Sequence, residues 1–371
     1  MKLEKPRDLI LPTSVFGFAA TPDGGRLYAA CLDGQIFEVD PASGVRTAFA
    51  EKHRSYATGC VLLPDRQTLI SAGYDGALIW HDVESKRAIR QVQAHQFWSR
   101  QMALSPGGDL VASVTGQYLA GGDKYEPAAE SEPSVKIYDT DSGDLVQTFS
   151  HLPPALSVTF SADARYLAAA NLMGEVRVWD VAGGRQVAQF ASADFTCWGI
   201  IKSPHYVGGI YGLAFAPDGQ SLLCCGMGPM TDPMAANGKM TWQRWAWRET
   251  PAKMLGQIHD GESGSGLMET LAYTPDGSAF LMAGRQAQGT WTAALFSASD
   301  GRLITSLDTK SRVTRAQFST DGKMLYLSAT HGQGPREKDS KKWPECGRIH
   351  IVPLTTAEAP PAPTATPQPK A

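Results

Sequence analysis

The densest group of reactive and aromatic side chains lies in the stretch VQAHQFWSRQMALSPGG, residues 91–107. It places His95, Trp98, Ser99 and Arg100 within six residues of one another. This density suits an active site or a ligand pocket, and it also suits a structural position in a repeated fold. The elements that position the stretch decide between these interpretations.

A second group of residues could bind a metal ion. His205, His259 and His331, with Asp260 or Glu262 beside them, offer the nitrogen and carboxylate ligands that zinc prefers. Their spacing matches no ligand motif, so only the fold could bring them together. The sequence contains no H-E-x-x-H, no C-x-x-C, no glycine-rich phosphate loop and no G-x-S-x-G. We therefore expect no catalytic residue and no cofactor.

Composition excludes several classes of protein. The formal net charge of −3 gives no global attraction to nucleic acid or to an anionic membrane. Glu4, Pro6 and Arg7 interrupt the stretch where a signal peptide needs an apolar run, and no window approaches about 18 apolar residues. Cys31, Cys60, Cys224 and Cys225 fall inside apolar strand-like runs, where a free cysteine behaves as a small buried hydrophobe, and this fits a reducing compartment. We expect a cytoplasmic protein that binds neither nucleic acid nor membranes.

The chain is built from repeats. Seven tetrapeptides each follow one apolar run and precede another, and the shortest intervals between them are 42 residues. They are TPDG (21–24), LPDR (63–66), SPGG (105–108), SADA (161–164), APDG (216–219), TPDG (274–277) and STDG (319–322). The sequence therefore predicts seven copies of one unit, with insertions in some of them.

Each unit has the pattern of four short strands. The clearest copy reads ALSVTF, RYLAAA, VRVWD and RQVAQF, with turn residues between the runs. Asp33-Gly34 and Asp75-Gly76 are dipeptides typical of tight turns between antiparallel strands. These patterns predict an all-β fold.

The VWD at 178–180, the IYD at 137–139, the Asp-Gly turns and a histidine ahead of the first strand resemble the WD-repeat family. The resemblance covers residues 7 to about 354 and implies a seven-bladed β-propeller of four-stranded antiparallel blades around a central channel. The last copy has three strands, so we expect RDLIL at 7–11 to supply the fourth and close the ring. Residues 1–354 would form the propeller and 355–371 a proline-rich disordered tail.

The resemblance also implies structural roles for several polar residues. In the family, a histidine at this place joins a buried network with an Asp, a Ser or Thr, and a Trp. His81 stands in the Trp position of the second copy, and Met173 in the Asp position of the fourth. We expect structural roles for the matching residues, which are His53, Ser71, Asp75, His95, His151 and Trp179.

The insertions predict one functional face. They fall between the second and third strands or between units, at 116–133, 192–209, 228–239, 259–267 and 331–347, and these places lie on the same face of a propeller. Loops on a rigid scaffold carry binding residues, although their aromatic side chains could also pack the loops down on the disc. The expected binding residues are Trp98, Arg100, Tyr118, Tyr125, Trp198, Tyr206, Met230, Arg336 and Trp343.

Aromatic rings beside mixed charges suit a protein or peptide interface. The sequence therefore favours a non-catalytic WD-repeat scaffold, itself monomeric, that binds a protein or peptide partner through the insertion-rich face. The alternative is a propeller enzyme, or a subunit of a redox enzyme, with a metal or small ligand at the channel mouth.

Overall fold

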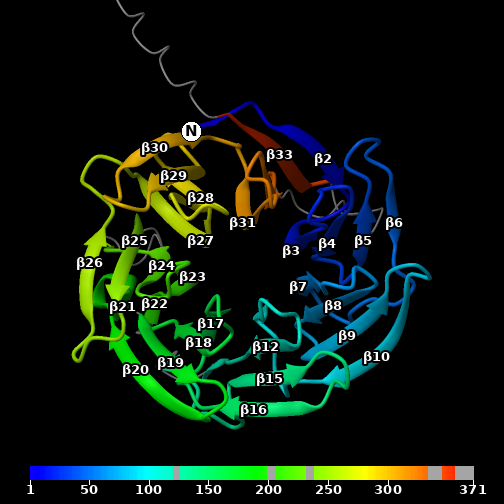
Figure 1. Ribbon diagram of the computed structural model, residues 1–371, viewed down its shortest axis with the longest axis horizontal. Coiled ribbons are helices and arrows are strands. Elements are labelled where there is room, and N and C mark those ends of the chain that lie inside the picture. The colour runs from blue at the N-terminus through cyan, green and yellow to red at the C-terminus, as the bar shows by residue number, and fades with distance from the viewer. Residues whose placement is uncertain (120–125, 199–205, 231–237, 333–344, 356–371) are drawn as a thin grey trace, which may run out of the picture.

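In the computed structural model the chain is almost entirely β-structure. The structure describes residues 1–119, 126–198, 206–230, 238–332 and 345–355. Within these ranges the one helical element is a short 3-10 turn, Ala193–Phe195, and no helix is long and apolar enough to cross a membrane. The strands form antiparallel sheets that stand side by side around a central axis (Figure 1). The prediction of an all-β fold is confirmed.

Four of the sheets contain four strands each, in chain order. The first comprises β3 (Val15–Ala20), β4 (Leu27–Cys31), β5 (Ile36–Val39) and β6 (Arg46–Ala48). The second comprises β7 (Ala57–Leu62), β8 (Thr68–Gly73), β9 (Ala77–Asp82) and β10 (Arg87–Gln93). The third comprises β11 (Gln101–Leu104), β12 (Leu110–Val114), β15 (Val135–Asp139) and β16 (Leu145–Phe149). The fourth comprises β17 (Ala155–Phe160), β18 (Tyr166–Asn171), β19 (Glu175–Asp180) and β20 (Arg185–Ala191).

Two further sets of four strands are joined into one sheet. The first set comprises β23 (Ile210–Phe215), β24 (Leu222–Met227), β25 (Gly238–Ala246) and β26 (Lys253–Gln257). The second comprises β27 (Ser265–Tyr273), β28 (Ala279–Gln288), β29 (Ala293–Ser297) and β30 (Leu303–Leu307). Strand β25 pairs with β27 through Gly238 with Gly266 and Lys239 with Ser265. Part of the segment 259–267, expected to be a link, is therefore a strand.

The two ends of the described chain share the last sheet. It contains β31 (Arg312–Phe318), β32 (Met324–Thr330) and β33 (Gly347–Thr355). The outer edge of β33 pairs with β2 (Arg7–Leu11) and, beyond it, with β1 (Lys2–Leu3). The residues expected to form the tail lie outside the described ranges, apart from Thr355.

Side chains within the tetrapeptides fix the turns between first and second strands. The Ser161 hydroxyl donates a hydrogen bond to the Asp163 carboxylate (2.5 Å) and accepts one from the backbone N–H of Tyr166 (2.9 Å). Thr274 and Ser319 make the same pair of contacts in their own turns. A hydroxyl and an Asp two residues apart hold a turn in this way because both bond to nearby backbone groups.

Each of the two Asp-Gly turns packs against the backbone of the segment that leads into the next sheet. Gly76 has φ +73°, and a Cβ there would lie 2.2 Å from the carbonyl oxygen of His95. Gly34 has φ +84°, and a Cβ there would lie 2.3 Å from the carbonyl oxygen of His53. The turn of one sheet thus packs directly on the link that enters the next, and only glycine fits.

The innermost strands contact one another in chain order, and the last of them, β31, contacts the first, β3. Hydroxyl side chains reinforce these contacts. Thr58 Oγ1 donates to the Ser99 carbonyl (2.8 Å), Ser157 Oγ to the Ile210 carbonyl (3.0 Å), and Thr314 Oγ1 to the Val15 carbonyl (2.6 Å). This arrangement is consistent with a β-propeller, in which neighbouring sheets pack around a channel.

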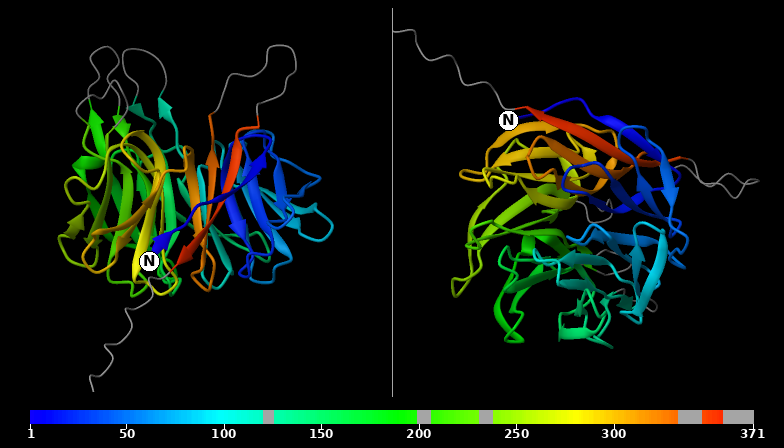
Figure 2. Two further views of the ribbon diagram at one scale, coloured as in Figure 1. Left: turned by 90° about the horizontal axis from the view of Figure 1, so that it is seen from above. Right: turned by 45° about the vertical axis from the view of Figure 1, so that its right-hand side comes forward.

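Two short hairpins extend the disc on one side (Figure 2). They are β13 (Tyr118–Leu119) with β14 (Glu126–Pro127), and β21 (Thr196–Trp198) with β22 (Tyr206–Gly208). Both lie in segments that the repeat pattern marks as insertions. The sequence did not predict strands there.

Candidate functional site

A buried hydrogen-bonded chain crosses the second sheet. His53 Nδ1 and Asp75 Oδ1 are 2.9 Å apart, and the ring nitrogen donates because the carboxylate can only accept. Ser71 Oγ lies 2.9 Å from Nε2 of His53 and 2.9 Å from Nε2 of His81. Burial lowers the pKa of His81 to about 4, so this ring is neutral at pH 7 and shares a hydrogen bond with Ser71. His81 thereby takes the place that the WD-repeat resemblance gives to tryptophan.

His95 and His151 lie at the corresponding places of the next two sheets. His95 Nε2 is 2.9 Å from Ser113 Oγ, and His151 Nε2 is 3.3 Å from the Ala169 carbonyl oxygen. Burial lowers the pKa of both imidazoles to about 3. The His151 ring packs edge-on against Trp179, with centroids 6.0 Å apart. His95 is therefore a neutral, buried ring inside the fold, and the reactive appearance of residues 91–107 does not come from a solvent-accessible base.

The histidines considered as metal ligands have other partners. His259 is exposed, and its Nε2 lies 3.1 Å from the Asp300 carbonyl oxygen. His331 is also exposed, with Nδ1 3.2 Å from Ser311 Oγ, and His205 lies outside the described residues. In the part of the chain that the structure describes, no three His, Cys, Asp or Glu side chains are placed to share a metal ion.

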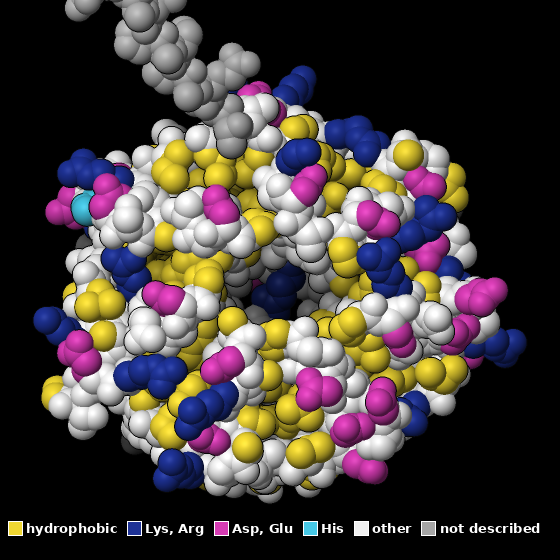
Figure 3. Space-filling model, in the orientation of Figure 1, with side chains coloured by type: hydrophobic (Ala, Val, Ile, Leu, Met, Phe, Trp, Pro, Cys, Tyr) yellow, Lys and Arg dark blue, Asp and Glu magenta, His cyan; other side chains and the backbone are white. Residues whose placement is uncertain are grey.

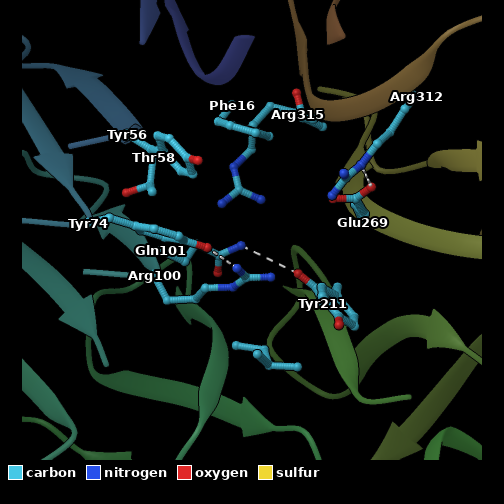
Figure 4. Close-up of a pocket in the computed structure, with 12 residues that line it drawn as sticks. Phe16, Tyr56, Thr58, Tyr74, Arg100, Gln101, Tyr211, Glu269, Arg312 and Arg315 are labelled. Atoms are coloured by element: carbon cyan, nitrogen blue, oxygen red, sulfur yellow. Dashed lines mark hydrogen bonds and ion pairs between the residues drawn. The ribbon is translucent and has the colours of Figure 1, made fainter. Parts of the chain in front are cut away.

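A cavity of about 230 Å³ opens at the centre of the disc, where the inner strands begin (Figure 4). Basic side chains are visible at the base of the central hollow, whereas acidic and basic groups are interspersed over the surrounding surface (Figure 3). The wall contains one residue of each repeat, always six residues before the second residue of the tetrapeptide. These residues are Phe16, Thr58, Arg100, Leu156, Tyr211, Glu269 and Thr314.

Irregular strand pairing aims these side chains into the cavity. In six of the inner strands, the pairing register with the second strand of the same sheet shifts at the residue that lines the cavity. A bulge of this kind leaves one residue outside the ladder and redirects its side chain. On β31 the shift at Thr314 has a further effect. Arg312 and Arg315, which strict alternation would place on opposite faces, both line the cavity.

One of the cavity arginines is neutralised by a carboxylate. Arg312 donates from Nε to Glu269 Oε1 (2.6 Å) and from Nη2 to Glu269 Oε2 (2.8 Å). These two bonds raise the pKa of Arg312 and commit both carboxylate oxygens to it. Glu269 is the only acidic residue that lines the cavity within the described ranges.

Arg100 is held by aromatic residues. Its guanidinium donates to the Tyr74 hydroxyl and lies 5.9 Å from the centroid of that ring and 5.8 Å from the centroid of Tyr211. Burial opposes the charge, but the Tyr74 and Tyr211 side chains outweigh it and raise the pKa of Arg100. The head group is therefore charged and fixed in direction, facing the cavity (Figure 4).

Arg315 has no such partner. Its guanidinium points into the middle of the cavity (Figure 4), and among the described residues no hydrogen-bond acceptor or carboxylate pairs with it. Burial among the channel walls lowers the pKa of Arg315 to about 10, with Arg100 adding to the effect and Glu269 opposing it. The group remains a cation at neutral pH.

An arc of aromatic rings leads from the cavity to the surface. Phe16 packs on Tyr56 (centroids 6.4 Å apart), Tyr56 on Tyr74 (5.5 Å), and Tyr74 stacks on Trp98 (4.3 Å, 5° between planes). Phe97 also stacks on Trp98, with ring centroids 4.4 Å apart. Tyr56 and Trp98 remain 45% and 40% exposed. We refer to Phe16, Tyr56, Tyr74, Phe97 and Trp98 as the aromatic arc.

Of the expected binding residues, the structure brings Trp98 and Arg100 together at the cavity. Met230 is half-buried after β24. Three others, Tyr118, Trp198 and Tyr206, belong to the projecting hairpins, where the structure describes only the backbone. The remaining three, Tyr125, Arg336 and Trp343, lie outside the described residues.

Sequence reasoning missed most of the cavity wall. Arg312, Arg315, Tyr56, Tyr74 and Tyr211 were not candidates, because they lie in or next to strands that look like core. A signal was nevertheless present. Arg100, Tyr211 and Glu269 lie at the same position of their repeats. Aligning the seven tetrapeptides therefore shows polar residues at a position of the inner strand where apolar residues would be expected.

A comparison of the chain with models of known protein families finds no family that matches.

Proposed function

We propose that the protein is a non-catalytic binding module that holds a protein or peptide partner on the face where the cavity opens. The observation that carries this proposal is the aromatic arc. It leaves a tryptophan and a tyrosine about two-fifths exposed, already stacked and therefore fixed in place, with Arg100 beside them. Trp, Tyr and Arg are the residues most enriched where partners bind most strongly.

Preorganised rings favour binding for an energetic reason. Immobilising a side chain on association costs about 0.5–1.5 kcal/mol of conformational free energy. Trp98 stacks on both Tyr74 and Phe97, with centroids 4.3 and 4.4 Å away, so most of that cost is already met in the free protein. A partner that covers the arc would also remove exposed apolar surface from water.

We further propose that the fold is a seven-bladed WD-repeat propeller closed by its N-terminal strand, and that it acts as a scaffold. Three observations support this. The seven tetrapeptides share one phase, β2 supplies an outer strand to β33, and His53, Ser71 and Asp75 form the polar chain that the resemblance implies.

The binding proposal is tested by affinity capture from native extract with matched variants. The test variant combines Tyr56→Ala with Trp98→Ala, which removes the exposed rings. The control is Ile89→Ser. Ile89 lies on β10, the outer strand of the second sheet, and its side chain is 61% exposed. We expect wild type and control to retain a common set of partners that the double variant loses. Identical sets from all three proteins would show that the arc merely packs against its own chain.

A further inference from the structure

We propose that the cavity at the channel mouth is a binding site for a compact anionic group, a carboxylate or a phosphate, held between Arg100 and Arg315. The sequence left open a small ligand at the channel mouth, but it indicated neither an anion nor Arg315. The proposal concerns the channel itself and does not depend on a partner covering the aromatic arc.

The charges that line the cavity are unbalanced. Three guanidinium groups face one carboxylate, and that carboxylate is fully used by the bidentate pair between Arg312 and Glu269. Arg100 and Arg315 are left as two cations to which no carboxylate among the described lining residues is hydrogen-bonded. Two cations confined between low-dielectric walls repel each other and attract anions from solution.

The unpaired state of Arg315 points to a missing partner. A cation placed among protein walls without a hydrogen-bond acceptor is unfavourable, because the charge loses part of its hydration. Arg315 is in this position, whereas Arg312 has a bidentate carboxylate and Arg100 a tyrosine hydroxyl and two rings. An anion between them would restore to Arg315 the hydrogen bonds that its neighbours already have.

The surroundings also provide neutral donors and a limited volume. Burial raises the pKa of Tyr211, so its hydroxyl stays protonated and can donate. The cavity, at about 230 Å³, holds several water molecules at about 30 Å³ each. This is room for a carboxylate or phosphate group together with some water.

The anion could be a free small molecule or an acidic group that a bound polypeptide inserts into the channel. The chemistry at the arginines is the same, so both sources are tested with the full chain. Isothermal titration calorimetry at constant ionic strength uses inorganic phosphate as the free probe and an acetylated hexaglutamate peptide as the presented probe. Sodium chloride replaces each probe in the blank titration.

We expect saturable binding of at least one probe to a single site, weakened at least tenfold by Arg315→Met, which keeps the apolar stem and removes the charge. Arg302→Met, on the exposed surface, is the matched control and should bind like wild type. Binding of phosphate identifies a free anion as a ligand, and binding of the peptide alone identifies a presented acidic group. No binding of either probe, or equal binding to wild type and Arg315→Met, would overturn the proposal.

Arg315→Met has a second readout. Because the unpaired charge costs stability in the free protein, the variant should be at least as resistant to urea as wild type. If instead it does not fold, Arg100→Met replaces it in the titration with the same expected loss. The titration with phosphate contains no partner protein and the affinity capture reports on the aromatic arc alone, so a failure of the partner proposal is distinguishable from a failure of this one.

Discussion

Substitution of one buried histidine should change how the stability of the protein depends on pH. Burial lowers the pKa of His95 to about 3 from the usual 6.5. As the pH falls below 6.5, the unfolded chain takes up a proton at this residue, whereas the folded protein does not until about pH 3. The folded state therefore loses stability as the pH drops through this window.

The magnitude follows from the two pKa values. Between pH 8 and pH 5, one such histidine reduces the free energy of unfolding by about 2 kcal/mol, since each pKa unit is worth about 1.4 kcal/mol. His95→Gln removes the titrating group and retains a polar atom that can reach Ser113, 2.9 Å from the imidazole. The variant loses some stability at every pH, but its loss between pH 8 and pH 5 should be about 2 kcal/mol smaller than that of wild type.

Urea unfolding at pH 8, 7, 6 and 5, followed by tryptophan fluorescence, measures this difference. Contributions from carboxyl groups are common to both proteins and cancel in the comparison. His259→Gln serves as the control, because that side chain is exposed in the folded state. Equal losses of stability in wild type and His95→Gln would refute the conclusion that His95 is buried and neutral.

Three other substitutions test the scaffold by urea or thermal unfolding. Asp75→Asn removes the carboxylate that accepts a hydrogen bond from His53 at 2.9 Å, and it should lower the free energy of unfolding by about 1–3 kcal/mol. Unchanged stability would contradict the buried hydrogen-bonded chain of the second sheet. Thr314→Val removes the bond to the Val15 carbonyl at 2.6 Å and should cost about 1 kcal/mol, with Thr159→Val on an inner strand as its control. Gly76→Ala places a Cβ 2.2 Å from a carbonyl oxygen at positive φ and should cost about 2 kcal/mol or more; a neutral effect would rule out this turn.

The strands of the fold were largely predictable because their pattern is local. The runs read from the fourth copy correspond to β17, β18, β19 and β20 within a few residues. The alternation of apolar and polar residues, the turn residues and the phase of the repeat each predict a strand from a few neighbouring positions. The hairpins β13–β14 and β21–β22 were not predictable, because strands of two or three residues have no measurable period.

The site was predictable only in part, for a reason that also lies in local geometry. Trp98 and Arg100 stood out by residue type, but Arg315 did not, since it follows an apparently regular strand start. A register shift at Thr314 turns Arg312 and Arg315 toward the same cavity. Bulges depend on how two strands pair, and a single strand's sequence does not reveal them.

The central claim, that a partner binds over the aromatic arc, is tested most directly by site-specific photo-cross-linking. A photoreactive phenylalanine analogue at position 98 should cross-link to a partner in native extract, and the same analogue at position 89, on the outer strand β10, should not. The cross-linked polypeptide can then be identified by mass spectrometry. Equal cross-linking at the two positions, or none at position 98 under conditions where a partner is retained, would contradict the claim.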